Sequence, residues 1–332
     1  MQFEPSMVEG SYLRDILAEP EAIAETVAGL NGDSPLTGER FARVVLTGMG
    51  ASYHALHPLH LQLVDRGFHA AMVETAELIH YLAAMLSAGT LVVAVSQSGR
   101  SVEIVRLLDL AVGRVRIMGV TNTPDSPLAA RSDMTVLTHA GEESSVSCKT
   151  YVAMLAALAW LGAATELQEA AAAAKTYLAD WETKVAALTD LLAGTRTLFV
   201  VGRGSSMAAA GTGGLILKES AHFHAEGMTC SAFRHGPFEL TGPATAVLIF
   251  AGDPRTRALN ASLAADVRKA GGRAFWIGPD SEIDAFRIPA APDAVRPILE
   301  ILPVQLVSLA LAALAGHQPG DFKLLTKVTT IE

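Results

Sequence analysis

Short apolar runs alternate with segments of helical periodicity in both halves of this chain. In the first half the runs cover residues 43–47, 70–74, 90–96, 115–121 and 134–139, and in the second half 197–202, 246–251 and 273–278. The segments between them, such as 101–112, repeat apolar residues at helical intervals. Strands that alternate with helices form parallel sheets with both faces covered. The pattern therefore predicts an α/β protein with two doubly wound parallel sheets in tandem.

The two halves also share a motif. The segment 44–55, VVLTGMGASYHA, has a counterpart in 198–209, LFVVGRGSSMAA, so that Gly48 corresponds to Gly202 at an offset of 202 − 48 = 154. Ser52 corresponds to Ser206 at the same offset. Each copy predicts a strand, a tight glycine turn and the start of a helix. A match that divides the chain near its middle indicates a duplicated domain.

The domain boundaries follow from the helical segments around this repeat. Residues 152–190 are rich in alanine, with Leu, Trp and Glu at helical intervals, and predict helices that connect the domains. The stretch 298–316 is very apolar but contains Glu300, Pro303 and Gln305, and therefore predicts a buried helix rather than a membrane span. We expect an N-terminal helical segment, a first domain, a connecting helix, a second domain and a C-terminal tail, at residues 1–40, 41–165, 166–190, 191–316 and 317–332.

Composition narrows the classes of partner. Half of the residues are hydrophobic, enough for two sizeable cores, and the net charge of 25 − 34 = −9 disfavours a nucleic-acid footprint. Cys148 and Cys230 form no CxxC pair, so neither a disulfide framework nor a metal site is expected. The first residues lack the apolar core of a signal peptide. We therefore expect a cytoplasmic protein that binds neither membranes nor nucleic acid.

The clearest candidate site is the segment 95–101, VSQSGRS, which follows a predicted buried strand and opens a helix. Ligands of open parallel sheets bind at the carboxyl ends of the strands. Hydroxyls, an amide, a glycine and a helix N-terminus together suit a phosphate group. A plain N-cap turn is the alternative reading. At the same offset the second half has FAGD, without hydroxyls and with an acid, so the phosphate site is expected in the first half alone.

Other residues taken alone carry less information. The G-x-G-x-S turns are similar to dinucleotide loops, but Tyr53 and Met207 stand in place of the third glycine, so a nicotinamide cofactor is not favoured. Glu219, His235 and Lys327 would by default be a helix carboxylate, a loop histidine and a solvated tail lysine. The residues by themselves indicate an α/β protein that binds phosphate.

A series of short motifs points further. In chain order they are ILAEP (16–20), GMGASY (48–53), SQSG (96–99), AGEE (140–143) with SVSCKTY (145–151), LKE (217–219), RHGP (234–237) and LTKVT (325–329). With these motifs the chain resembles the sugar-isomerase (SIS) family. Within that family it resembles the isomerase half of glucosamine-6-phosphate synthase and the stand-alone glucosamine-6-phosphate deaminases and fructosamine-6-phosphate deglycases. The resemblance implies two tandem flavodoxin-like SIS domains.

The resemblance also implies roles for individual residues. Glu219 matches the base that moves a proton between C1 and C2 of an open-chain sugar, and Lys327 the lysine that forms an imine with the C2 carbonyl. His235 matches a ring-opening histidine contributed by a neighbouring subunit, which implies a homodimer. No cofactor is implied, because the imine serves as the electron sink. Sugar and phosphate are expected to contact Ser52, Ser96, Gln97, Ser98, Ser101 and, with the facing residue left open, Ser145, Val146 or Ser147.

The expected function is that of an amino-sugar-phosphate isomerase and deaminase, which converts glucosamine 6-phosphate to fructose 6-phosphate and ammonia. No glutaminase domain precedes residue 1, so a glutamine-fed synthase is not expected. A fructosamine-6-phosphate deglycase remains an alternative. A non-catalytic sugar-phosphate sensor is a further alternative, against which the joint presence of Glu219, His235 and Lys327 argues.

Overall fold

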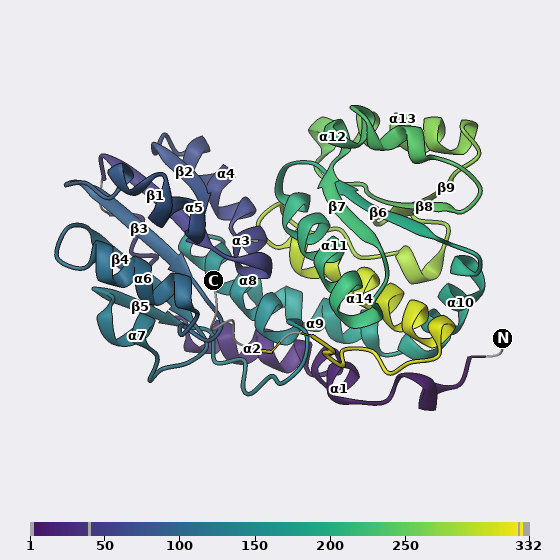
Figure 1. Cartoon of the computed structure of the whole chain (residues 1–332), viewed down its shortest axis with the longest axis horizontal. Helices are drawn as coiled ribbons and strands as arrows, with labels where there is room; N and C mark the ends of the chain where they lie inside the picture. Colours follow the sequence, from purple (N-terminus) through teal and green to yellow (C-terminus); the bar gives the residue numbers. More distant parts are fainter. Residues whose placement is uncertain (1–2, 39–40, 325, 328–332) are drawn as a thin grey trace.

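Two α/β units lie side by side and are joined by helices from the middle of the chain (Figure 1). The structure, a computed structural model, describes residues 3–38, 41–324 and 326–327. Both sheets are parallel throughout, which confirms the predicted fold class.

The first sheet has the strand order β2-β1-β3-β4-β5. Its strands are β1 (Arg43–Gly48), β2 (Ala70–Glu74), β3 (Thr90–Val95), β4 (Arg116–Thr121) and β5 (Met134–Leu137), and its helices are α3 (Gly50–Ala55), α4 (His57–Asp65), α5 (Thr75–His80), α6 (Val102–Ala111) and α7 (Pro127–Arg131). Alternate residues of β3 belong to different apolar clusters, Val93 to one and Val92 to the other. Both faces of the sheet are therefore buried, as a doubly wound fold requires.

The second sheet has the order β7-β6-β8-β9, which repeats the first without its last strand. Its strands are β6 (Thr197–Gly202), β7 (Ala225–Thr229), β8 (Thr245–Phe250) and β9 (Arg273–Ile277), with helices α11 (Met207–Ala221), α12 (Cys230–Arg234) and α13 (Pro254–Lys269). Short 3-10 helices are η1 (Pro5–Val8), η2 (Ala83–Met85), η3 (Gly204–Ser206), η4 (Pro237–Leu240) and η5 (Asp284–Phe286).

The apolar pattern did not predict β7, whose sequence AEGMT contains no apolar run. Its glycine reflects close packing under α11. A Cβ on Gly227 would lie 2.1 Å from the carbonyl oxygen of Ala210, and a Cβ on Gly214 would lie 2.2 Å from the Gly227 nitrogen. Small residues on α11 and β7 thus let the helix backbone approach the strand. Because glycine takes the place of a larger apolar residue, the sequence of β7 lacks the apolar run that predicts a strand.

Helices from the middle and end of the chain form the shared core. α8 (Lys149–Leu161), α9 (Leu167–Leu178) and α10 (Trp181–Leu192) connect the two sheets, and α14 (Arg296–Ala315) packs against α9, α10 and α11. Among the described residues α14 is the one helix long and apolar enough to cross a membrane, but it is almost entirely buried inside the protein. The prediction of a buried helix is confirmed.

The N-terminal segment joins this core through buried polar contacts. It contains α1 (Ser11–Leu17) and α2 (Glu19–Gly29). The Gln305 Nε2 group on α14 donates a hydrogen bond to Glu19 Oε1 over 2.5 Å, and the hydroxyls of Tyr12 and Ser308 lie 3.1 Å apart. Burial raises the pKa of the Glu19 carboxyl well above its ordinary value.

Candidate active site

A cavity of about 420 Å³ lies where β1 and β3 end. Helix α11 of the second domain and the C-terminal tail complete its wall. Most of the residues that the sequence singled out line this cavity, namely Ser52, Ser96, Gln97, Ser98, Ser101, Ser145, Ser147, Glu219 and Lys327. Two units and the tail therefore build one site.

The loop after β3 has the shape of an anion cradle. Gly99 adopts a left-handed φ of 60°, and its N–H donates to Ser96 Oγ over 3.1 Å. Ser101 precedes α6, and its hydroxyl makes no cap hydrogen bond with that helix. Arg100 points away to Asp125, 3.0 Å distant on the surface. Among the described lining residues Lys327 is the only Lys or Arg, so hydroxyls, backbone N–H groups and the α6 N-terminus form the cradle.

Replacing Gly99 by alanine should damage this cradle. The new Cβ would lie 2.3 Å from Ser126 Oγ, a buried hydroxyl that caps α7. We expect a loss of about 1–3 kcal/mol of stability and weaker binding of inorganic phosphate, measured by thermal melting and calorimetry. Gly113→Ala is the control, because Gly113 has a similar φ of 76° with nothing within 4 Å of its Cβ site. Equal phosphate binding by both variants would refute the role given to the loop.

Glu219 enters the cavity from the last turn of α11. Burial raises the pKa of its carboxyl to about 7, and the nearby cations Lys327 and Lys218 moderate the rise. A carboxyl with a pKa near neutrality is suited to accept a proton and return it. Leu215, one helical turn earlier on α11, lines the cavity beside Glu219.

Lys327 reaches the same cavity from a tail that folds back over α11. The Gly320 N–H donates to the Ser220 carbonyl over 3.0 Å, and Ser145 Oγ donates to the Gly320 carbonyl over 2.8 Å. Gly320 has a φ of 82° and lies against Tyr12, where a side chain would collide. The Lys327 ammonium then donates to the Ser145 carbonyl over 2.7 Å and to Glu143 Oε2 over 2.5 Å.

Glu143 is a residue of this site to which the sequence analysis gave no role. Its side chain is fully buried, and its Oε1 accepts hydrogen bonds from the backbone N–H groups of Cys148 and Thr150 over 3.0 and 3.1 Å. Its Oε2 accepts from Thr150 Oγ1 over 2.6 Å and from Lys327. The sequence held one signal for this contact. An acidic residue shortly before a helix, here the helix that begins at residue 149, can cap that helix by accepting hydrogen bonds from its first N–H groups.

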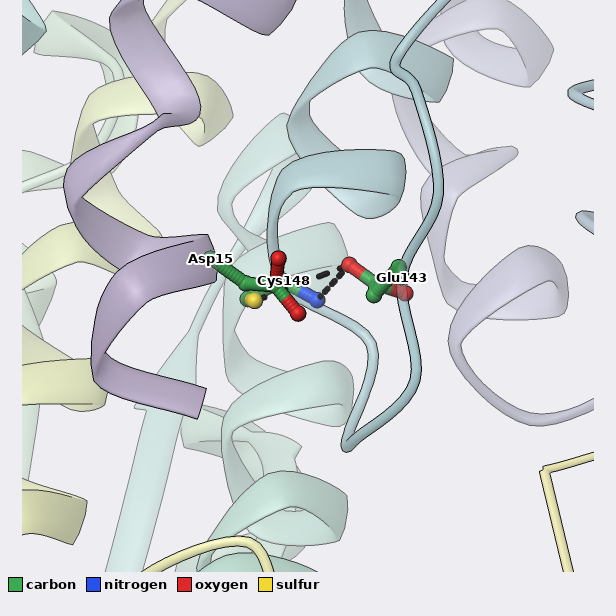
Figure 2. A group of neighbouring side chains, drawn as sticks. All are labelled: Asp15, Glu143 and Cys148. Atoms are coloured by element: carbon green, nitrogen blue, oxygen red, sulfur yellow. Dashed lines mark hydrogen bonds between the residues drawn. The ribbon is translucent and has the colours of Figure 1, made fainter. Parts of the chain in front are cut away.

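Glu143 also lies close to Asp15 and Cys148 (Figure 2). One ligand-type atom from each falls within 4.8 Å of the others, the spacing of a possible metal site. The donors already present argue against one, because Asp15 pairs with the Lys149 ammonium at 2.8 Å and both Glu143 oxygens accept hydrogen bonds. Burial, and then the Glu143 charge, raise the pKa of the Cys148 thiol well above its ordinary value, which disfavours the thiolate that binds metal.

Two residues singled out in the sequence lie outside the cavity. Val146 is fully buried in the apolar core, while its neighbours Ser145 and Ser147 line the cavity. His235 follows α12 on the surface of the second domain, where it is exposed. The structure therefore brings Glu219 and Lys327 together in one chain, but not His235.

The second domain uses its copy of the motif differently. Ser206, the counterpart of Ser52, is fully buried and donates to Glu300 Oε1 over 2.8 Å. Asp253 caps α13 by accepting from the Arg255 N–H over 2.6 Å, and the Arg255 side chain holds the pKa of Asp253 well below its ordinary range. The hydroxyl that faces a cavity in the first domain is thus bonded to the core in the second.

The family follows from comparison with known proteins. The SIS domain model matches residues 39–164 and 191–315, so the chain belongs to the SIS domain family, with two copies in tandem. Both parallel sheets lie within the matched segments.

Individual relatives narrow the comparison. The chain is 30% identical over 349 residues to the isomerizing glutamine–fructose-6-phosphate aminotransferase of Pyrococcus horikoshii, covering 98% of this chain and 58% of that protein. It thus spans less than two thirds of that relative. It shares its fold with glucosamine-6-phosphate deaminase from Thermotoga maritima (TM-score 0.83, 17% identity, 97% and 100% of the two chains). The same holds for the C-terminal domain of glucosamine-fructose-6-phosphate aminotransferase from Francisella tularensis (TM-score 0.80, 21% identity, 96% and 100%).

Proposed function

We propose that this protein is an amino-sugar-6-phosphate isomerase and deaminase, which converts glucosamine 6-phosphate to fructose 6-phosphate and ammonia. The observation that carries the proposal is the convergence of three features on one cavity. These are the hydroxyl-lined cradle of residues 96–101, the Glu219 carboxyl with a pKa of about 7, and the Lys327 amine.

The chemistry assigns one task to each group. With the phosphate in the cradle, Glu219 takes the proton from C2 of the open-chain sugar, and the C2 ammonium passes one proton to the C1 aldehyde oxygen. Glu219 then returns its proton to C1, which leaves a protonated imine at C2. The Lys327 amine adds to C2 and ammonia leaves. Water then adds to the lysine imine, releases fructose 6-phosphate and restores the amine. The balance is glucosamine 6-phosphate plus water to fructose 6-phosphate plus ammonia.

Ring opening is assigned to His235 of a second copy, in a homodimer. Support comes from the position of His235, which is exposed and lies outside the cavity of its own chain. The molecular mass in solution tests this part of the proposal, and a monomer that is fully active would refute it.

A deglycase that splits a fructosamine 6-phosphate is the second candidate. In its favour, a hollow of about 720 Å³ shares Gln97 with the candidate site, and its other lining residues include Asn122, His139, Glu142 and Glu143. Such a space could receive the amine substituent of a larger substrate.

Product analysis separates the candidates. The protein is incubated with glucosamine 6-phosphate and, separately, with a fructosamine 6-phosphate that carries an amino acid. We expect ammonia from the first substrate and little glucose 6-phosphate from the second. Glucose 6-phosphate from the second substrate alone would favour the deglycase, and binding without turnover of either would favour a sensor.

A further inference from the structure

We propose that Glu143 is the positioning residue for Lys327: its carboxylate holds the lysine nitrogen at the site where the imine forms. The inference rests on the proposed function, which gives Lys327 its covalent role. It goes beyond that function because Glu143 itself does not touch the sugar in the proposed reaction. The juxtaposition that carries it is the 2.5 Å contact between Lys327 Nζ and Glu143 Oε2.

Glu143 provides a rigid reference point. Its side chain is fully buried, and the start of α8 holds it through the N–H groups of Cys148 and Thr150 and the Thr150 hydroxyl. A carboxylate that accepts this many hydrogen bonds has no rotational freedom left. Its position is therefore set by the first domain and not by the tail.

Lys327, in contrast, belongs to the tail, whose described residues 317–324 and 326–327 form no helix or strand. The tail is fixed at Gly320 by hydrogen bonds to Ser220 and Ser145, and the next two residues are held by His222 and by the apolar core, which still leaves several residues before the lysine. A lysine side chain has many accessible rotamers, so an untethered amine would be dispersed over many positions. Holding it before the substrate arrives removes the cost of ordering it from the reaction.

The Glu143 carboxylate also complements the charge of Lys327 both before and after the imine forms. Lys327 Nζ is a cation as ammonium, and it is again a cation as protonated imine. In the condensation with a ketose, the nitrogen adds to C2 as the free amine. Counted from the ammonium, it gives up two protons that leave with the carbonyl oxygen as water, so one positive charge is present before and after. A fixed carboxylate beside the nitrogen stabilises both states.

The two carboxylate oxygens of Glu143 contact different groups, so a substitution of the same shape can remove one set of contacts and keep the other. Oε1 accepts from the backbone of α8, whereas Oε2 accepts from Lys327. Glu143→Gln retains a carbonyl oxygen for the backbone N–H groups and replaces Oε2 by an amide that cannot accept from an ammonium. Asp15→Asn is the matched control, since it makes the same change at the same helix start, where Asp15 pairs with Lys149.

The experiment measures borohydride trapping of Lys327 with fructose 6-phosphate, with the adduct located by peptide mass. A hydrogen bond to a charged group is worth about 1.5–3 kcal/mol, so we expect Glu143→Gln to trap about tenfold to a hundredfold more slowly than wild type. We expect Asp15→Asn to trap at the wild-type rate. Wild-type trapping by Glu143→Gln, or an equal loss in Asp15→Asn, would overturn the inference.

A second readout does not depend on the imine. In competitive acetylation, Lys327 of the wild type should react more slowly than the exposed Lys175, and Glu143→Gln should remove that protection. If the wild type forms no adduct, the covalent role in the proposed function fails, while acetylation still decides whether Glu143 holds the lysine. If the glutamine variant does not fold, Glu143→Asp takes its place, and wild-type trapping by this shorter carboxylate would overturn the inference.

Discussion

Replacement of Glu219 by glutamine is expected to lower kcat on glucosamine 6-phosphate by about 10²–10⁴-fold, the usual contribution of a positioned acid–base group. The amide keeps the shape of the side chain but cannot take the C2 proton. Because Glu219 comes from α11 of the second domain and the residues proposed to hold phosphate come from the loop after β3, the affinity for inorganic phosphate should change little. Ammonia release and calorimetry measure the two effects, with Glu182→Gln, an exposed carboxylate on α10, as the control. Undiminished ammonia release would refute the role of Glu219.

The pKa of Glu219 also predicts a pH dependence. The base must be ionised to act, and its pKa of about 7 means that kcat/KM should fall as the pH drops below 7. Folding stability should show the opposite trend. The pKa is raised from 4.5, so the buried charge costs stability as the pH rises from about 4.5 to 7, and the full cost remains above 7. Glu219→Gln should therefore melt at a higher temperature than wild type at pH 8, which would also show that the inactive variant is folded.

The second large effect is expected for Lys327→Arg. Arginine keeps a cation beside the buried Glu143 carboxylate, but its guanidinium cannot form an imine. We expect complete loss of the borohydride adduct and of ammonia release, with a melting temperature close to that of wild type. The control is Lys323→Arg, which makes the same change at an exposed position of the tail.

An adduct that persists in Lys327→Arg would place the imine on another lysine. Normal turnover without any adduct would show that deamination proceeds by direct addition of water to C2. Either result would remove the covalent role from Lys327 while leaving the acid–base role of Glu219 intact.

The sequence predicted those parts of the fold in which burial leaves a periodic signal. The strands β1, β3 and β6 are apolar because both faces are covered, and their positions were predicted to within a residue or two. The edge strand β7 carries no such signal. Residue 227 must be glycine because α11 approaches too closely for a side chain, and Glu226 is partly exposed. The repeat held the missing information, since β2 at 70–74 shifted by 154 falls at 224–228.

The candidate site was predictable where the chemistry lies in the residue type. Hydroxyls and a glycine after a buried strand indicated a candidate phosphate site without a structure, and the serines among those residues line one cavity. The role of Glu143 was not predictable in this way, because it depends on contacts between segments separated by 184 residues. The side chain of Val146 likewise could not be placed, since whether a loop residue faces the core or the cavity depends on the turn that carries it.

The buried pairs Glu19–Gln305 and Tyr12–Ser308 have a consequence for how the chain folds during synthesis. They join residues 286 and 296 positions apart, so they raise the contact order and cannot form until α14 has left the ribosome. The strands of the first sheet are complete by residue 137, and α2 meets its partners α8 and α9 by residue 178, but η1 and α10 lack the surface of α14 against which they pack until late in translation. Nascent chains that end before residue 296 are therefore expected to expose the sides of η1 and α10 that α14 covers and to be clients of chaperones.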